Sequence, residues 1–264
     1  MGETIARRQG PGRTLVLADF NETALSKAAD ALRADGYDVE SQVVDVSDRA
    51  SIQELAATAA ARGAVTEVVH TAGLSPTQAP ALAILKVDLA GVAFVLDEFG
   101  AVVAPGGAGV VIASMAGSMA AGSFPAELEG ALAATPSDQL LQLPFWSDPV
   151  FSDAGAAYSV AKRANQLRVQ GASIAWGQRG ARINSVSPGV IVTPMGQQEL
   201  NGPSGSQMRA MIAASGTKRL GTSGDIASAV AFLLSSQASF ITGTDLLVDG
   251  GVTAALRCGA LQLG

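Results

Sequence analysis

Short apolar stretches alternate with helix-like stretches along almost the whole 264-residue chain. The helix-like stretches, such as 24–32 and 156–176, repeat apolar residues three and four positions apart, which places them on one helix face. Apolar strands joined by helices predict βαβ units, and therefore a doubly wound, parallel α/β sheet covered on both faces, in one domain over 1–264. The predicted strands lie at about 14–18, 39–46, 66–69, 109–113, 182–186 and 245–248.

The composition argues against several classes of protein. The 17 Lys and Arg residues against 23 Asp and Glu leave a net charge of −6, which disfavours a nucleic-acid partner. A single cysteine, Cys258, and a single histidine, His70, supply neither a disulfide framework nor a metal cluster. Because no apolar run reaches the ~18 residues of a membrane span, we expect a soluble, cytoplasmic protein with no metal and no membrane partner.

Acidic residues lie at the ends of two of the predicted strands, at the sheet edge where such folds bind ligands. A carboxylate at Asp19 can accept hydrogen bonds from both hydroxyls of an adenosine ribose and would repel a 2′-phosphate, which favours NAD(H) over NADP(H). The alternative is that Asp19 only begins the turn before Asn21. Asp45 and Val46 could flank an adenine ring, although an acid at a helix entry is the simpler interpretation.

The segment Tyr158-Ser159-Val160-Ala161-Lys162 carries the strongest chemical signal. Positions i and i+4 share one helix face, so the phenol and the ammonium can act together. A free tyrosine titrates near pH ~10, and a neighbouring ammonium lowers that value because it stabilises the phenolate. The alternative is an ordinary amphipathic face. Ser114 supports the chemical interpretation, since it ends a strand where its hydroxyl could hold a carbonyl oxygen beside Tyr158.

Together these motifs resemble the classical short-chain dehydrogenase/reductase family, in the family order and over almost the whole chain. Each motif alone has a plain structural alternative, such as a strand-to-loop turn at Pro188-Gly189, but seven in register are hard to reconcile with chance. The matching pieces are Asp19, Asp45-Val46, Ala72-Gly73, Ser114 with Gly117, Tyr158 with Lys162, Pro188-Gly189 with Thr193, and Ile241-Thr242-Gly243 leading to Asp249-Gly250-Gly251.

The resemblance implies a Rossmann-like fold and an NAD-dependent oxidoreductase that interconverts a secondary alcohol and a ketone. Tyr158 would be the catalytic acid and base, Lys162 would lower its pKa and hold the nicotinamide ribose, and Ser114 would orient the substrate oxygen. A homo-oligomer, dimer or tetramer, is common in the family. Cofactor-binding roles carry over to Gly2, Asp19, Asp45, Val46, Ala72, Gly73, Pro188, Gly189, Ile191 (through its backbone) and Thr193, in addition to Tyr158 and Lys162.

Two single residues depart from the family pattern. A long helix expected over about 80–103 carries Asp88 where the family has an asparagine that holds a water in a proton relay to the lysine. Asp88 can accept the same hydrogen bonds and therefore keeps a catalytic assignment, but it adds charge near Lys162; the alternative is an ordinary helix acid. His70 replaces another family asparagine, and we expect a satisfied structural histidine there.

The segment 115–152 is an insertion that breaks the alternation, and it separates Ser114 from Tyr158 by 44 positions. Its apolar residues could form a lid over the substrate pocket or reshape a subunit interface. Bacterial 3α-hydroxysteroid dehydrogenase/carbonyl reductases carry an insertion at this point and look similar around Trp176-Gly177 and Ser187-Pro188-Gly189. This finer resemblance implies a bulky, apolar, steroid-like or aliphatic or aromatic substrate.

The front of the chain also departs from the family. Gly2 aligns with the last glycine of the family's Gly-rich turn, so the first strand and the earlier glycines are missing and the sheet should lack one central strand. We expect that the native start lies upstream of Met1; a truly truncated relative is the alternative. Accordingly, the alternative function is a non-catalytic or weakly cofactor-binding member that acts as a subunit or binding protein.

Overall fold

The computed structural model describes residues 1–261, and its six strands, all in parallel pairing, form two sheets. The doubly wound α/β fold predicted from the alternation is confirmed. The main difference in bounds is β4, which begins at Val103 because that residue pairs with Val65 ahead of a register shift. The strands are β1 (Thr14–Asp19), β2 (Asp38–Val43), β3 (Val65–His70), β4 (Val103–Ile112), β5 (Arg182–Pro188) and β6 (Asp245–Val248).

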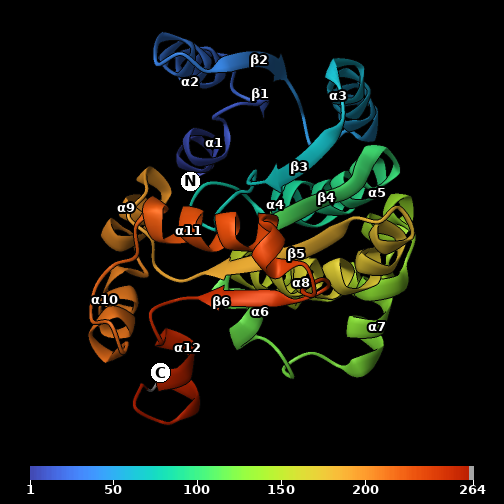
Figure 1. Ribbon diagram of the computed structural model, residues 1–264. Helices are drawn as coiled ribbons and strands as arrows, with labels where there is room; N and C mark the ends of the chain where they lie inside the picture. The colour runs from blue at the N-terminus through green and yellow to red at the C-terminus, as the bar shows by residue number, and fades with distance from the viewer. Residues whose placement is uncertain (262–264) are drawn as a thin grey trace.

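The sheet is divided between β1 and β3. Strands β1 and β2 pair only with each other, and the second sheet has the order β3-β4-β5-β6. Figure 1 shows the two-stranded sheet standing apart from the four-stranded one. Across the division, the guanidinium of Arg13 lies 2.9 Å from the carboxylate of Glu67. Within the described residues this is the arrangement expected of a sheet without one central strand.

Helices cover both faces of the four-stranded sheet. On one face α5 and α8 pack against the strands and α3 packs against α5, whereas α11 covers the other face with α1 beside it (Figure 1). None of the helices within residues 1–261 combines the length and the apolar character needed to cross a membrane. The helices outside the insertion are α1 (Gly2–Gln9), α2 (Glu22–Ala34), α3 (Arg49–Arg62), α4 (Ala81–Ile84), the π-helical turn η1 (Leu85–Gly91), α5 (Val92–Val102), α8 (Ala154–Gln178), α9 (Pro194–Asn201), α10 (Gly205–Ala214), α11 (Ser223–Leu234), the 3₁₀ turn η5 (Ser236–Ala238) and α12 (Val252–Arg257).

Local signals in the sequence set the ends of these helices. Asn21 caps α2 by accepting a hydrogen bond from the backbone N–H of Ala24, and α8 begins after Asp153, whose carboxylate accepts from Ala156 N–H. Thr222 and Asp225 form a reciprocal capping box at the start of α11. Because each cap satisfies backbone donors that would otherwise be orphaned, it fixes where the helix follows its strand.

Glycine permits close packing in the core around Trp176. The indole lies fully buried on α8 and donates a hydrogen bond of 3.0 Å to the carbonyl of Leu96 in α5. A Cβ atom on Gly109 of β4 would come within 2.7 Å of that indole, and one on Gly100 of α5 within 2.8 Å of its nitrogen. The missing side chains therefore let α8 sit directly on the sheet, which positions the face of α8 that carries Tyr158.

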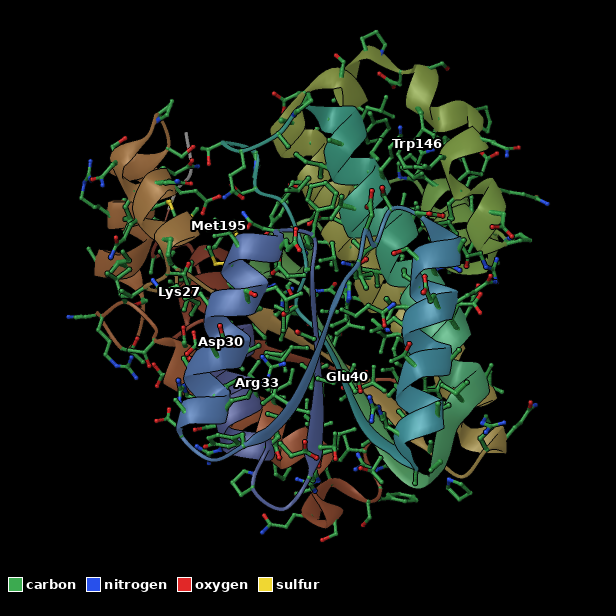
Figure 2. The ribbon with its side chains drawn as sticks, turned by 90° about the horizontal axis from the view of Figure 1, so that it is seen from above. Lys27, Asp30, Arg33, Glu40, Trp146 and Met195 are labelled. Carbon is green, nitrogen blue, oxygen red and sulfur yellow. The ribbon has the colours of Figure 1, made fainter. Side chains whose placement is uncertain are left out.

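The insertion forms a wall packed on α8 and α4. Leu128, Leu132 and Leu140 are buried in one apolar cluster with residues of α4, η1 and α8. Figure 2 shows Trp146 of the insertion on the side of the molecule away from Lys27 of α2. The insertion comprises α6 (Met115–Met119), α7 (Ala126–Ala134), and the 3₁₀ helices η2 (Ser137–Gln142), η3 (Pro144–Ser147) and η4 (Pro149–Ser152).

Arginines of α8 hold this wall in place. The guanidinium of Arg163 forms two hydrogen bonds with the carboxylate of Glu129, at 2.7 and 3.2 Å. Arg168 donates to the carbonyls of Leu132 and Thr135 at 3.1 and 2.9 Å. Tyr158 borders the same apolar cluster. The insertion is therefore part of the packed fold and forms one side of the surroundings of Tyr158.

Candidate active site

Ser114, Tyr158 and Lys162 converge at the carboxyl ends of β4 and β5, as the sequence predicted. Ser114 follows β4 and caps α6, where its hydroxyl accepts a hydrogen bond of 3.2 Å from Ala116 N–H. Tyr158 and Lys162 lie one turn apart on α8, with the ammonium 5.5 Å from the centre of the phenol ring. The helix α6 closes on α8 at Gly117, which brings the Ser114 hydroxyl next to the phenol.

The surroundings of Tyr158 oppose one another in their effect on its pKa. Burial raises the pKa of the phenol, and the charges of Asp88 and Glu199 raise it further, whereas Lys162 and the Ser114 hydroxyl lower it. The net result is a pKa above the ordinary value of a tyrosine. The sequence predicted that Lys162 lowers the pKa of Tyr158, but not that burial and the two acids together outweigh this lowering.

Lys162 is buried in an ion pair with Asp88. Its ammonium lies 3.0 Å from the Asp88 carboxylate and 3.4 Å from the Ile112 carbonyl. Burial lowers the pKa of Lys162, but the charges of Asp88 and Tyr158 together outweigh burial, so the pKa is raised. The lysine therefore remains a cation next to Tyr158 at neutral pH.

Asp88 is held by an irregular turn that the sequence did not predict. The expected continuous helix over 80–103 contains the π-helical turn η1 around Asp88. The Asp88 Oδ1 accepts a hydrogen bond of 2.8 Å from the backbone N–H of Leu74, in the loop after β3. Such turns often mark functional sites because they re-aim one side chain. Here the turn aims a carboxylate at the ammonium.

The predicted cofactor residues at the start of the chain lie at the ends of β1, β2 and β3. A Cβ atom on Gly2 would lie 2.8 Å from the Thr71 hydroxyl, so the start of α1 closes on the loop after β3. In that loop, a Cβ atom on Gly73, next to Ala72, would lie 3.3 Å from the ammonium of Lys162. Asp19 is exposed at the end of β1 and accepts from Asn21 N–H.

Asp45 and Val46 lie in the loop after β2. Asp45 accepts hydrogen bonds from the backbone N–H and the hydroxyl of Ser47, in the turn that precedes α3, whereas the cap of α3 is Asp48. The Val46 carbonyl would lie 2.9 Å from a Cβ atom on Gly91. An exposed acid at a strand end suits the ribose of a nicotinamide dinucleotide, and a helix N-terminus such as the start of α1 suits its pyrophosphate. The residues present therefore fit these two parts of such a cofactor.

The segment after β5 contains a close backbone contact at Gly189 and a helix cap at Thr193. Gly189 N–H donates to the Val248 carbonyl, and a Cβ atom there would lie 2.6 Å from the Asp249 Cα. Pro188 ends β5, Ile191 forms a parallel bridge with Gly221, and Thr193 caps α9 by accepting from Gly196 N–H at 3.0 Å. These residues are thus brought to the same edge as Lys162.

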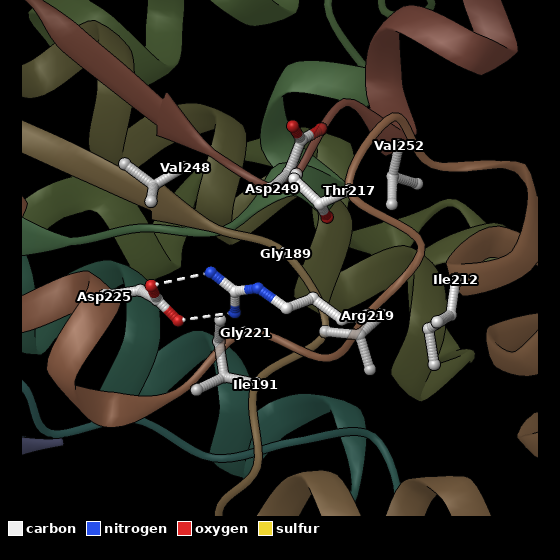
Figure 3. Close-up of a pocket in the computed structure, with 12 residues that line it drawn as sticks. Gly189, Ile191, Ile212, Thr217, Arg219, Gly221, Asp225, Val248, Asp249 and Val252 are labelled. Atoms are coloured by element: carbon white, nitrogen blue, oxygen red, sulfur yellow. Dashed lines mark hydrogen bonds and ion pairs between the residues drawn. The ribbon is translucent and has the colours of Figure 1, made fainter.

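A pocket of about 170 Å³ opens beside this segment (Figure 3). Its lining includes Gly189 and Ile191 of the segment after β5, together with Thr217 and Asp249. A bidentate ion pair between Arg219 and Asp225, at 2.8 and 2.9 Å, occupies its polar part. Tyr158 does not line the pocket, so the pocket is separate from the predicted reaction centre.

Sequence reasoning missed Glu199 and misjudged His70. Glu199 lies on α9, its pKa is raised chiefly by burial, and its charge acts on Tyr158; no motif marked it. The expectation of a satisfied histidine was wrong, because the buried Nε2 of His70 finds no hydrogen-bond partner among the described residues. Burial and the nearby Lys162 lower the pKa of His70 to about 3, so the imidazole is neutral.

Comparison with known proteins agrees with this geometry. The family model described as "Enoyl-(Acyl carrier protein) reductase" matches residues 1–127 and 140–253. The chain is 43% identical over 256 residues to the short-chain dehydrogenase/reductase bsc3 of Alternaria brassicicola, covering 97% of this chain and 93% of that protein.

Two solved structures have the same fold. The 3α-hydroxysteroid dehydrogenase of Pseudomonas sp. B-0831, complexed with NADH, has a TM-score of 0.73 and 26% identity, over 92% of this chain and 99% of that one. A gluconate 5-dehydrogenase of Burkholderia cenocepacia J2315, in complex with NADP and tartrate, has a TM-score of 0.73 and 24% identity, over 96% and 91%. The two differ in cofactor, and the likeness to the hydroxysteroid enzyme is weak in sequence.

Proposed function

We propose that this chain, which belongs to the short-chain dehydrogenase/reductase family and is an oxidoreductase acting on CH–OH groups like its relatives named dehydrogenases, uses NAD(H) to interconvert a secondary alcohol and a ketone of apolar character. The observation that carries the proposal is the convergence of Ser114, Tyr158 and Lys162 at one sheet edge. Ser114 caps α6, whereas Tyr158 and Lys162 lie on α8. In the sequence, Ser114 and Tyr158 are 44 positions apart.

Each of the three has a distinct part in the proposed reaction. In reduction, the phenol of Tyr158 gives its proton to the carbonyl oxygen, and the Ser114 hydroxyl holds that oxygen in place. In oxidation, the phenolate accepts the alcohol proton. The Lys162 ammonium stabilises the phenolate, because opposite charges close together in a buried site attract strongly. When bound, the nicotinamide cofactor supplies or accepts the hydride.

The preference for NAD(H) is proposed from Asp19. Its exposed carboxylate stands at the end of β1, where it would accept hydrogen bonds from the two ribose hydroxyls and repel a 2′-phosphate. Gly2, Asp45, Val46, Ala72 and Gly73 would hold the adenosine and phosphate half. The nicotinamide half would lie against Lys162 and the segment from Pro188 to Thr193.

The apolar character of the substrate is proposed from the insertion. Phe124, Leu143, Phe145 and Trp146 are partly buried against the cluster that Tyr158 borders. A ketone carried on an apolar ring or chain would bury apolar surface there, at about 25 cal/mol per Å².

The test is a panel of ketones and alcohols, from small polyols to bulky alicyclic compounds, each assayed with NAD(H) and with NADP(H). We expect turnover of the bulky apolar members with NAD(H), abolished in Tyr158→Phe. Turnover of polyols alone would overturn the substrate class, and equal rates with both cofactors would overturn the preference. Absence of turnover by the folded chain with every pair would contradict the proposed function.

We further propose a cytoplasmic homo-oligomer. One exposed cysteine, Cys258, suits a reducing compartment. Phe232 of α11 and Phe240 beyond it are exposed large apolar residues, and a partner subunit would cover such surface. Light scattering coupled to gel filtration would give the mass, and a monomer at micromolar concentration would contradict this part of the proposal.

A further inference from the structure

Asp88 and Lys162 form an enclosed ion pair beside Tyr158. The two charged atoms are 3.0 Å apart, the Asp88 side chain is fully buried, and that of Lys162 is 5% exposed. Gly73 closes the pair on the β3 side, because a Cβ atom there would lie 3.1 Å from the Asp88 Oδ2 and 3.3 Å from the ammonium. Water screening is weak at such a site, so each charge acts strongly on its neighbours.

The charges that face Tyr158 come from three elements. Lys162 on α8 is a cation, whereas Asp88 on η1 and Glu199 on α9 are acids that oppose a phenolate. His70 at the end of β3 is neutral, since its pKa is lowered to about 3, and Ser114 brings only a hydroxyl. Among residues 1–261, the one cation that acts on Tyr158 is therefore paired with a carboxylate.

We propose that Asp88 acts on Tyr158 by its charge: its carboxylate offsets the ammonium of Lys162 and itself opposes a phenolate, so it keeps the phenol protonated to higher pH than a neutral side chain at 88 would. This inference rests on the proposed function, and it adds which direction of the reaction is favoured at a given pH. A protonated phenol is the form that donates to a carbonyl oxygen. Asp88 therefore extends ketone reduction to higher pH and restricts alcohol oxidation to alkaline pH.

The composition of the chain allows a direct test. The sequence has two tyrosines, Tyr37 and Tyr158, so Tyr37→Phe leaves Tyr158 as the only group that yields a tyrosinate absorption band. Tyr37 is distant from Tyr158 in the sequence, and its hydroxyl donates a hydrogen bond to the Arg7 carbonyl. In this background, the tyrosinate band is titrated with pH in three proteins that carry Asp88, Asp88→Asn and Asp88→Glu, with circular dichroism at each pH.

We expect Asp88→Asn to lower the midpoint of Tyr158 by about one pH unit or more, the order of magnitude for one buried charge nearby. Asp88→Glu keeps the charge and is expected to stay near the parent midpoint, whereas a purely structural disturbance would move both variants alike. The parent could unfold before Tyr158 ionises. In that case, ionisation of Tyr158 in folded Asp88→Asn, before its circular dichroism signal is lost, also supports the proposal. Equal midpoints in the folded parent and Asp88→Asn would overturn the proposal.

A second pair of variants covers a failure to fold. If Asp88→Asn does not fold, the same substitution is made in a Lys162→Gln background. There, loss of the Asp88 charge leaves no buried cation without a partner. The midpoint is expected to fall relative to Lys162→Gln alone, and an unchanged midpoint overturns the proposal. Because this titration needs neither substrate nor cofactor, its outcome is independent of the substrate panel, which tests the proposed function by itself.

Discussion

A Cβ atom on Gly117 would lie 2.6 Å from the carbonyl carbon of Lys162. The first turn of α6 thus touches the backbone of α8 at Lys162, the lysine proposed to act with Tyr158, and this contact sets the distance from Ser114, the cap of α6, to Tyr158. Residue 117 tolerates no side chain unless one of the two helices moves. The glycine therefore links the packing of the insertion to the chemistry.

Gly117→Ala is expected to lower both stability and turnover. The methyl group overpacks the α6–α8 contact, which costs about 1–3 kcal/mol, and it moves Ser114 away from Tyr158. Gly130→Ala on α7 is the matched control, because a Cβ atom there meets nothing within 4 Å and alanine favours a helix by about 1 kcal/mol. Urea unfolding and kcat of both variants check this, and a Gly117→Ala enzyme with unchanged kcat would refute the link.

Tyr158→Phe is expected to reduce kcat by a factor of about 10²–10⁴, the usual contribution of a positioned acid or base. The affinity for NADH, measured by fluorescence titration, should stay within a factor of about two, since the phenyl ring remains in place. Tyr37→Phe is the control and should keep full activity. If Tyr158→Phe retained the turnover of the control, Tyr158 would not be the acid and base.

Asp19→Ala is expected to weaken the preference for NADH over NADPH by about tenfold, equivalent to about 1.4 kcal/mol. The physical reason is the loss of a carboxylate that repels a 2′-phosphate and binds ribose hydroxyls. The readout is the ratio of kcat/KM values for the two cofactors. Asp30→Ala on the exposed side of α2 removes the same charge at another place and should leave the ratio unchanged.

His70 is expected to make stability depend on pH. Burial and Lys162 lower its pKa to about 3 in the folded chain, against about 6.5 when unfolded. The unfolded chain therefore binds a proton that the folded chain excludes, so His70 contributes stability that falls as pH drops below about 6.5.

His70→Asn removes this contribution to the free energy of unfolding. Because the chain has no other histidine, the difference between parent and variant reports on His70 alone. Between about pH 7.5 and 5.5, the parent should lose about 1.4 kcal/mol more of its free energy of unfolding than the variant. Urea titrations at the two pH values give both losses. Equal losses would mean that the imidazole can be protonated in the folded state.

Sequence patterns predicted what depends on near neighbours along the chain. The strand positions follow from local apolar runs, and the shared face of Tyr158 and Lys162 follows from helical spacing. Glu199 escaped notice because its approach to Tyr158 depends on the path of α9, which no short motif records. The π-helical turn at Asp88 likewise has no local signature, since Leu85–Gly91 contains residues suited to a regular helix.

The insertion shows the same limit. Its leucines and aromatic residues indicated burial but not the surface that they bury against, so a lid and an interface element were both open. The structure places them on α8 and α4. An amphipathic pattern fixes which side of a segment is apolar, whereas the partner surface is decided by tertiary packing.

Leu132→Ala tests whether the insertion is an integral part of the fold. Leu132 is fully buried against α8, and truncation of such a leucine costs about 2–5 kcal/mol. Leu82→Ala on α4 is the control, because Leu82 is 60% exposed and should change stability by about 0.5 kcal/mol or less. Urea unfolding of both variants gives the comparison. If the insertion instead detached without unfolding the rest, Leu132→Ala would leave the global transition unchanged and expose 115–152 to limited proteolysis.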